Sequence, residues 1–347
     1  MNEIIYNSGV DKCFNLTESI ISLIGRARQW IKACNLFFDD PQIREALSDA
    51  LSRGVAVFIL TNLQGATAGK EKDKKSGKMK QGAQSAQNFA HAESISYLYE
   101  EGAHISGLDG LHAKFLLIDD KTGVVTSANF TPNSTSKITE VGVLVSDAEF
   151  DELEEIFDCL FLRPDKYKFA NNGTHYSFER PGQPIDTDVI SRKSKVRLTL
   201  GPTDRGTGFA LQNAKCFDLR DEIFSIITDT QPGEDLYIAT YSLESNAAGP
   251  NGTTLLQALL DAKKRGVKLH IVQRDKDGKN SLKGIYVQYH PDNHAKLVLS
   301  SQRGILFTGN LTNESFGHGF DLGVTLTDEQ INEAKIFIEK LIKKTEQ

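Results

Sequence analysis

The sequence predicts an α/β protein made of two similar halves, each a mixed β-sheet flanked by helices and related by a pseudo-two-fold axis. Three observations support this fold class. Apolar, strand-like runs alternate with segments of helical spacing along most of the 347 residues. The tripeptide His-Ala-Lys occurs twice, starting at His112 and at His294. A helical segment, the triplet Arg-Gly-Val and an apolar run also follow one another twice, at Arg53 and at Arg265.

The first elements of each half occur in the same order. In the first half, a helical segment runs into an apolar strand at 31–38, and segment 41–55 has apolar residues at helical spacing. A buried strand is expected at Val55–Leu60. In the second half, strands are expected at Leu236–Tyr241 and Val267–Val272, on either side of a helix. The order therefore predicts a duplicated architecture independently of the histidine motifs.

The first half is longer because of an insertion. Arg53 and His112 are 59 residues apart, whereas Arg265 and His294 are 29 apart, so about 30 residues are inserted, mostly within 64–87. This segment is rich in lysine, with Lys70, Lys72, Lys74, Lys75, Lys78 and Lys80. Such a charge run fits either a solvated loop or a basic flap that binds phosphates of nucleic acid beside an active site.

After each His-Ala-Lys motif, the pattern predicts two strands joined by a turn, a third strand that carries an acid, and a closing helix. Between the closing helix of the first half and the start of the second, the chain is rich in Asn, Gly and Pro, as linkers are. We place the boundary near Arg180–Ser194. The expected domains are therefore residues 1–180 and 195–347.

The composition is that of an ordinary soluble globular protein, with 39% hydrophobic and 25% charged residues. No secretory start and no apolar stretch of membrane-spanning length is present, which predicts a cytoplasmic protein without a membrane partner. The four cysteines are scattered, which favours reduced thiols over disulfides or a zinc site. A net charge of −6 argues against binding nucleic acid through overall charge, although a local basic patch can still attract it.

The two histidine motifs agree at five kinds of residue. Closing a one-residue gap in the turn aligns His112 with His294, Lys114 with Lys296, Ser127 with Thr308, Asn129 with Asn310 and Glu140 with Asp321. A single His-x-Lys would indicate only a surface pair. Two copies that share a hydroxyl, an amide and an acid indicate a functional site.

These residues resemble the phospholipase D superfamily, whose signature is H-x-K-x4-D followed by G-S-x-N. The first copy fits with Asp119 at the motif aspartate and departs only at Thr126, which replaces Gly. The second copy is degenerate, because Ser301 replaces the aspartate and Phe307-Thr308 replaces Gly-Ser. The resemblance covers most of the chain. It implies that the two sheets pack together and that both motifs meet at their interface.

Two histidines suit the cleavage of a phosphodiester. A neutral imidazole can attack phosphorus and form a phosphohistidine, while a protonated imidazole donates to the leaving oxygen. We expect His112 to be the nucleophile because its motif is the more complete. Lys114 and Lys296 would neutralise the non-bridging oxygens as charge develops. This scheme needs no metal or cofactor, and the sequence offers no strong carboxylate cluster or His/Cys set for one.

The remaining motif residues are expected to support this chemistry. Four side chains are expected to donate hydrogen bonds to the phosphate oxygens, namely Ser127, Asn129, Thr308 and Asn310. Glu140 and Asp321 are each expected to accept a hydrogen bond from the far ring nitrogen of a histidine and so fix its tautomer. In families like this one the motif aspartate lies away from the phosphorus. Asp119 and Ser301 are therefore expected to be structural, and the second site to be competent.

The resemblance leaves the substrate open, because the superfamily includes phospholipases, lipid transferases, nucleases and repair phosphodiesterases. The polar inserts and the lysine-rich segment favour a nuclease acting on DNA or RNA, in phage defence or DNA processing. A helicase or translocase partner would suit such a nuclease, although no residue demonstrates one. The alternatives are a phospholipase D or phosphatidyl transferase and a catalytically silent nucleic-acid-binding scaffold. Tyr6, Tyr237 and Tyr241 are expected in the core or sheet rather than as base-stacking platforms.

Overall fold

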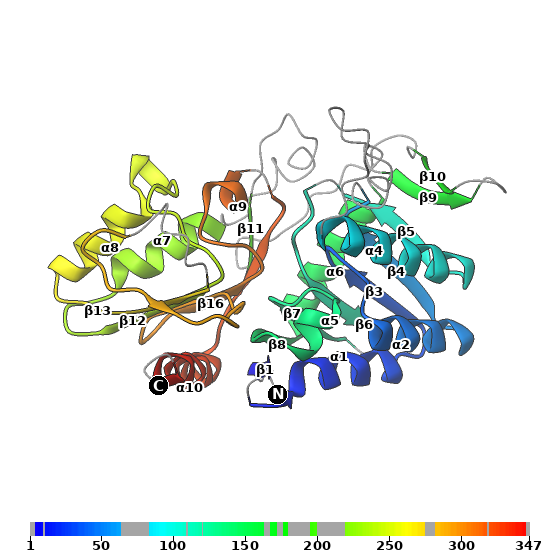
Figure 1. The fold of residues 1–347 in the computed structure, drawn as a ribbon, viewed down its shortest axis with the longest axis horizontal. Coiled ribbons are helices and arrows are strands. Elements are labelled where there is room, and N and C mark those ends of the chain that lie inside the picture. The colour runs from blue at the N-terminus through cyan, green and yellow to red at the C-terminus, as the bar shows by residue number, and fades with distance from the viewer. Residues whose placement is uncertain are drawn as a thin grey trace.

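The computed structural model describes residues 4–9, 11–63, 83–108, 110–119, 121–162, 167–171, 176–179, 195–199, 219–274, 282–317 and 319–344. Figure 1 shows two sheets flanked by helices, with the first half on the right and the second on the left. This arrangement confirms the α/β class and the two similar halves. The six lysines between Lys70 and Lys80 lie outside the described residues, as does segment 180–194 around the expected boundary.

The first half contributes the ten described strands of one sheet. They are β1 Ile4–Ser8, β2 Cys13–Phe14, β3 Trp30–Cys34, β4 Ala56–Thr61, β5 His104–Gly107, β6 Phe115–Ile118, β7 Thr122–Thr126, β8 Glu140–Ser146, β9 Tyr167–Asn171 and β10 Tyr176–Glu179. The spatial order is β10-β9-β5-β4-β3-β6-β7-β8-β1-β2. β3, β4 and β5 are parallel, and β6, β7, β8 and β1 continue the sheet as antiparallel neighbours.

The second sheet repeats the centre of the first. Its seven described strands are β11 Val196–Leu198, β12 Asp235–Thr240, β13 Lys268–Gln273, β14 Gln288–Tyr289, β15 Leu297–Leu299, β16 Gly304–Phe307 and β17 Leu322–Thr325. Their order, β14-β13-β12-β15-β16-β17-β11, matches β5-β4-β3-β6-β7-β8-β1 strand for strand. The parallel and antiparallel pairings match as well. The duplication predicted from the sequence is therefore a duplication of topology.

Helices cover both sheets. They are α1 Asn15–Arg26, α2 Pro41–Ser52, α4 Ala83–Glu100, α5 Pro132–Ser136 and α6 Asp147–Phe161 in the first half, and α7 Leu219–Asp229, η2 Pro250–Gly252, α8 Leu255–Lys264, α9 Asn313–Gly317 and α10 Asp328–Lys344 in the second. Among the described residues, α4 has no counterpart in the second half, so it is the described part of the insertion.

The repeated Arg-Gly-Val triplets have a common structural cause. Gly54 (φ +85°) and Gly266 (φ +92°) both adopt the left-handed conformation that ends a helix and that glycine tolerates best. Arg53 donates to the carbonyl of Ile24 at 3.0 Å, which ties the end of α2 to the end of α1. Arg265 does the same for α8 and α7 through carbonyls of the α7 end. The triplet therefore fixes how each helix pair packs.

Three buried apolar clusters hold the layers together. One lies between the first sheet and helices α1, α2 and α4, and another between the second sheet and α7 and α8. The third is shared by the halves and includes Phe115 and Val143 from the first sheet, Leu297 from the second, and residues of α6 and α10. Because apolar burial favours association, the shared cluster fixes the halves against each other where the motifs meet.

Candidate active site

The two histidines lie where the halves meet, each just before a central strand. His112 precedes β6 and His294 precedes β15. The amide of His112 donates to the carbonyl of Phe320 at 2.9 Å, and the amide of His294 donates to the carbonyl of Thr139 at 2.8 Å. Phe320 and Thr139 are the residues directly before the two motif acids. The backbone of each histidine is therefore held by the opposite half.

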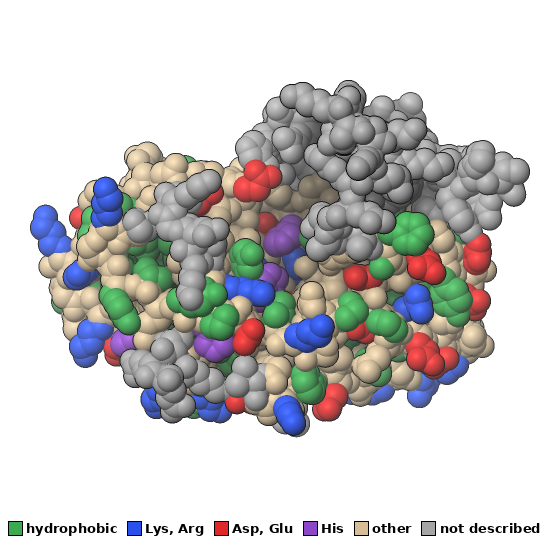
Figure 2. All heavy atoms as spheres, viewed as in Figure 1, with side chains coloured by type: hydrophobic (Ala, Val, Ile, Leu, Met, Phe, Trp, Pro, Cys, Tyr) green, Lys and Arg blue, Asp and Glu red, His purple; other side chains and the backbone are tan. Residues whose placement is uncertain are grey.

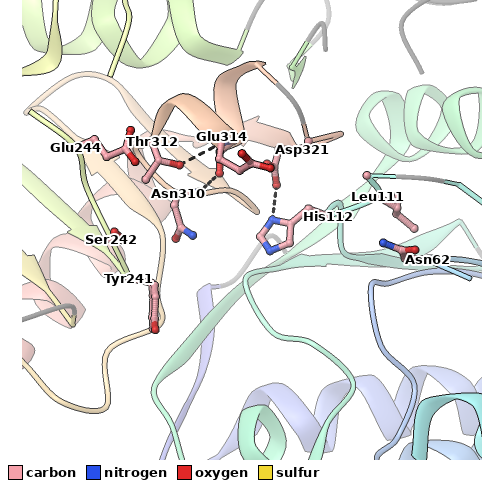
Figure 3. Close-up of a pocket in the computed structure, with 13 residues that line it drawn as sticks. Asn62, Leu111, His112, Tyr241, Ser242, Glu244, Asn310, Thr312, Glu314 and Asp321 are labelled. Carbon is pink, nitrogen blue, oxygen red and sulfur yellow. Dashed lines mark hydrogen bonds and ion pairs between the residues drawn. The ribbon is translucent and has the colours of Figure 1, made fainter. Parts of the chain in front are cut away.

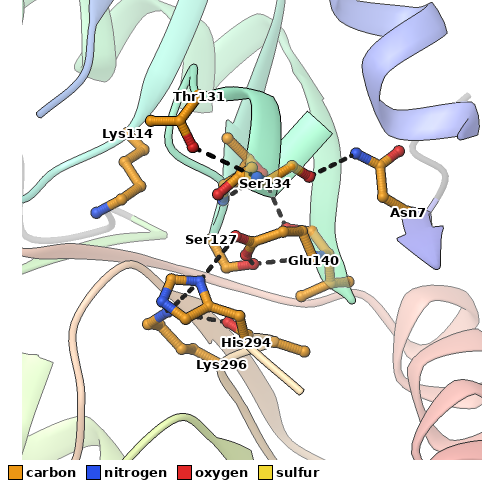
Figure 4. A network of polar contacts seen from close by, with 12 residues as sticks. Asn7, Lys114, Ser127, Thr131, Ser134, Glu140, His294 and Lys296 are labelled. Carbon is orange, nitrogen blue, oxygen red and sulfur yellow. Dashed lines mark hydrogen bonds and ion pairs between the residues drawn. The ribbon is translucent and has the colours of Figure 1, made fainter. Parts of the chain in front are cut away.

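Each acid also serves the histidine of the opposite half. His112 Nδ1 lies 2.7 Å from Asp321 Oδ1 (Figure 3), and His294 Nδ1 lies 2.7 Å from Glu140 Oε1 (Figure 4). Both carboxylates are almost fully buried. The sequence predicted two histidine–acid pairs but could not say which acid serves which histidine, because both choices have the same spacing. Neither half contains a complete pair by itself.

The charges of the pairs fix the proton on each imidazole. Burial acts to raise the pKa of Glu140 and of Asp321, but the charge of the paired histidine and its hydrogen bond outweigh burial and leave both pKa values below normal. An ionised carboxylate only accepts, so the proton of each neutral imidazole lies on Nδ1 and Nε2 carries the lone pair, which in His294 lies 3.4 Å from Lys296 Nζ. Burial lowers the pKa of His294 to about 4, and burial with the charge of Lys114 lowers the pKa of His112.

Ser127 and Thr308 hold the acids. Ser127 Oγ donates to Glu140 Oε2 at 2.5 Å and accepts from the amide of Val141, while Thr308 Oγ1 donates to Asp321 Oδ1 at 2.8 Å. Both residues are fully buried. A hydroxyl has one proton, and here that proton is used by a carboxylate. A phosphate oxygen would have to compete with a carboxylate for either hydroxyl proton, and the assignment of these two residues to phosphate binding stays a prediction.

Asn129 and Asn310 have amides that can still take a ligand. The side-chain oxygen of each is buried and has no hydrogen-bond partner among the described residues. Asn310 lines a cavity and extends toward its centre in Figure 3. Buried polar atoms are nearly always hydrogen-bonded, so the unpaired oxygen of Asn310 beside the cavity indicates a place for a group that donates a hydrogen bond, whereas a phosphate oxygen would need the amide nitrogen. Assignment of these residues to phosphate binding stays a prediction.

Lys114 and Lys296 are fully buried and come from opposite halves (Figure 4). Each Nζ donates to the carbonyl of its own motif histidine, at 2.6 and 2.9 Å, and Lys296 Nζ also lies 3.2 Å from His294 Nδ1. Burial together with the charge of Lys296 lowers the pKa of Lys114 to about 7. Burial lowers the pKa of Lys296 to about 8. Two buried cations that repel each other favour an anion between them.

A cavity of about 820 Å³ opens beside His112, and most of the residues that line it are polar or charged. Asn62, Leu111 and His112 line it from the first half, with Tyr241, Ser242 and Asn310 from the second. Tyr241 is 37% exposed, and its ring lies 5.3 Å from the ring of His294. Its sequence-based placement in the core or sheet is therefore wrong. Tyr241 directly follows β12, and the end of that apolar run was the signal that could have located it.

Asp119 and Ser301 make hydrogen bonds at equivalent turns, but Asp119 accepts them whereas Ser301 donates one. The Asp119 carboxylate accepts from the amides of Arg28 and Gln29, just before β3, at 2.7 to 3.1 Å. At the equivalent turn, Ser301 Oγ donates to Glu234, just before β12, at 2.5 Å. Both contacts join a hairpin to the start of a central strand. They are compatible with a structural role for the motif aspartate, which stays a prediction for both residues.

The described part of the chain gives two further observations. It contains no group of three or more His, Cys, Asp or Glu side chains placed to hold a metal ion. No helix within it is long and apolar enough to cross a membrane. The lysines predicted to bind nucleic acid, Lys70 to Lys80, lie outside the described residues.

Comparisons with known proteins agree with this architecture. The family model for "Cardiolipin synthase, PLD-like domain" matches residues 20–161. A phosphatidylserine synthase of Haemophilus influenzae superposes with a TM-score of 0.61 and 15% identity, over 98% of this chain and 86% of the synthase. A polyphosphate kinase of Porphyromonas gingivalis superposes with a TM-score of 0.57 and 12% identity, over 100% of this chain and 50% of the kinase.

This chain therefore spans about half the length of the polyphosphate kinase. Nuc of Salmonella typhimurium, a phospholipase D family member, matches 46% of this chain and 93% of its own at 21% identity and a TM-score of 0.36. No curated protein sequence matches the chain. The two superpositions that extend over nearly the whole chain share the fold of both halves.

Proposed function

Because the chain belongs to the phospholipase D superfamily, whose chemistry is that of phosphodiester bonds, we propose that it is a phosphodiesterase, and more narrowly a nuclease that cleaves DNA or RNA. One observation carries the proposal. Two histidine–carboxylate pairs cross the interface between the halves, at 2.7 Å each, beside a polar cavity. Such pairs supply a nucleophile and a general acid without further groups.

In the proposed reaction, His112 attacks phosphorus through its free Nε2 lone pair. Its side chain is 26% exposed and lines the cavity, whereas that of His294 is 15% exposed. The bond from phosphorus to the leaving oxygen breaks, and protonated His294 gives that oxygen its proton. Neutral His294 then takes a proton from water, which attacks the phosphohistidine and releases His112.

The same environment accounts for the protonation states. In the free protein both histidines have pKa values below normal, so at pH 7 the nucleophile is ready but the acid is not charged. A bound phosphodiester brings a negative charge, which favours the protonated form of a nearby imidazole. Lys114 and Lys296 would compensate the charge that develops on the non-bridging oxygens. Asn129 and Asn310 would donate neutral hydrogen bonds to the same oxygens.

The cavity wall supports a nucleic acid over a lipid as the substrate. A lipid enzyme needs an apolar surface for acyl chains, whereas among the residues that line the described wall only Leu111 and Tyr241 have large apolar side chains. An exposed tyrosine next to a catalytic histidine also suits a nucleobase. A basic flap at Lys70 to Lys80 and a helicase or translocase partner remain part of the nuclease proposal.

The test is cleavage by purified protein in EDTA, with labelled single-stranded DNA, duplex DNA, RNA and phosphatidylcholine vesicles in parallel. His112→Asn removes the proposed nucleophile, and its matched control is His104→Asn, which changes an exposed histidine stacked on Phe58 outside the cavity. We expect cleavage of a nucleic acid that is lost by at least roughly 10²-fold in His112→Asn and kept in His104→Asn.

Two results would replace this proposal. Release of the lipid headgroup with intact nucleic acids would establish a phospholipase D or phosphatidyl transferase. Binding of nucleic acid without cleavage of any substrate, unchanged in His112→Asn, would favour a scaffold that has kept the fold without turnover.

A further inference from the structure

The cleft is asymmetric where the strand order is symmetric. β13 and β4 are equivalent strands, each parallel to the central strand of its sheet. Arg274 follows β13 at its carboxyl end, and Asn62 follows β4 at the same place. A cation therefore stands on the His294 side of the site and a neutral amide on the His112 side.

Arg274 is fixed at this position by Tyr241. Its amide donates to the carbonyl of Tyr241 at 3.1 Å, and its guanidinium lies 5.5 Å from the centre of the tyrosine ring. The same ring lies 5.3 Å from the ring of His294 and is exposed in the cavity wall. None of the ion pairs recorded within the described ranges involves Arg274. The charge of Arg274 also reaches the site, because after burial it contributes to lowering the pKa of Lys296.

Arg274 lies behind Tyr241 and does not itself line the cavity, whose carboxylates have the opposite charge. Glu244 and Glu314 line it, and Glu244 is held by Asn313 at 3.0 and 3.1 Å. Figure 2 shows histidines in the hollow between the halves, with acidic side chains above them and basic side chains, beside some acidic ones, below. Phosphates are repelled from the acidic side chains and attracted to the basic ones.

We propose that Arg274, supported by Tyr241, binds the phosphate next to the scissile one, so that the substrate is a strand with successive phosphates held in one direction. The inference rests on the proposed nuclease function and narrows it. A guanidinium matches the geometry of phosphate oxygens, and an aromatic ring beside it accepts an unstacked base. Phosphatidylcholine has a single diester and cannot use this subsite, whereas every internal nucleotide of a strand can.

The first experiment measures kcat/KM of the wild type and of Arg274→Gln on two substrates. One is a single-stranded oligonucleotide, and the other is bis(p-nitrophenyl) phosphate, which has one phosphate. We expect kcat/KM for the oligonucleotide to fall roughly 10-fold further than for the small diester. The matched control is Arg44→Gln, because Arg44 lies 5.4 Å from the ring of Tyr97 in an equivalent pair away from the cavity. Equal losses on both substrates would overturn the inference.

The second experiment measures oligonucleotide binding against salt concentration in a His112→Asn background, which keeps the strand intact. Loss of one phosphate contact to a single strand lowers the slope of log K against log salt by about 0.7. Arg274→Gln should show this change, and Arg274→Lys should keep the wild-type slope because it keeps the charge. A slope unchanged in Arg274→Gln would overturn the inference, even if the protein folds and cleaves normally.

A competition experiment distinguishes two sources of successive phosphates. Inorganic polyphosphate that displaces the oligonucleotide in wild type, and is itself bound more tightly, would overturn the nucleic-acid assignment. Failure of the wild type to bind or cleave any nucleic acid would instead refute the proposed function. Cleavage with an unaffected Arg274→Gln variant would refute only the subsite.

Discussion

The pairing across the halves can be tested most directly with Glu140→Gln. The substitution keeps the shape of a buried side chain and removes its charge, which lies 2.7 Å from His294 Nδ1. The new amide can still accept from His294 through its oxygen and donate to Ser127 through its nitrogen. A defect in this variant therefore reports lost charge rather than lost packing.

The size of the effect follows from the lost interaction. A hydrogen bond to a charged group contributes roughly 1.5 to 3 kcal/mol, which corresponds to about 10- to 150-fold in rate if the transition state needs all of it. Glu140 is the main influence that raises the pKa of His294, against burial and the charge of Lys296. Without it, protonated His294 is harder to form, and protonation of the leaving oxygen should slow by this factor.

The assay combines kcat/KM on a small diester with ¹⁵N spectra of the histidine side chains. Glu140→Gln should change the ring signals of His294 and leave those of His112 nearly unchanged. Asp321→Asn should do the reverse, because Asp321 lies 2.7 Å from His112 Nδ1. If Glu140→Gln instead altered the His112 signals, the acids would serve their own halves and the reasoning would be refuted.

Three further predictions concern activity and stability. Lys114 has a pKa of about 7, so kcat/KM should fall as pH rises above 7 and this lysine loses its charge. The free energy of unfolding should instead rise from pH 7 toward the ordinary lysine pKa, because in that range only the unfolded state still holds this proton. Turnover and urea denaturation measured over the same pH series check both signs. Gly309→Ala would place a methyl group 2.6 Å from Asp321 Oδ2 and should reduce turnover by roughly 100-fold, whereas Gly317→Ala, with open space around it, should not. Asp119→Ala should lower the free energy of unfolding by about 1 kcal/mol with turnover retained, and a large loss of turnover in well-folded protein would contradict its structural role.

Repetition within the sequence explains why much of the site was predictable. Two copies of His, Lys, amide and acid at matching spacing imply equivalent strands, and equivalent strands related by a two-fold axis bring their motifs together. That logic correctly placed His112, Lys114 and Glu140 with their counterparts. It could not choose a hydrogen-bond partner for Ser127, because the position of this hydroxyl in the sequence fits a bond to Glu140 and a bond to a phosphate equally well. Which partner it takes depends on burial, and Ser127 is fully buried.

The residues missed by the sequence lie where the halves differ. Arg274 corresponds to Asn62, so neither appears as a repeat. Tyr241 ends an apolar run and has the composition of a sheet residue, although it leaves the sheet to line the cavity. Periodicity reports which residues are buried within an element, but a cavity wall is built from the residues just beyond strand ends. These positions follow tertiary packing, which the repeat does not encode.

The hydrogen bond of Ser301 explains why the second motif tolerates a serine in place of the motif aspartate. Side chains that cross the interface must fit the opposite half, whereas the hairpin contact of Ser301 with Glu234 stays within its own half and can reverse donor and acceptor. Ser301→Asp would place two carboxylates together at this turn, so we expect a lower urea midpoint with nearly unchanged turnover. Adding Glu234→Gln should restore the midpoint, because the amide can donate to the new carboxylate. A large gain in turnover from Ser301→Asp alone would show that the second motif is catalytically impaired by its serine, and that the contact is more than structural.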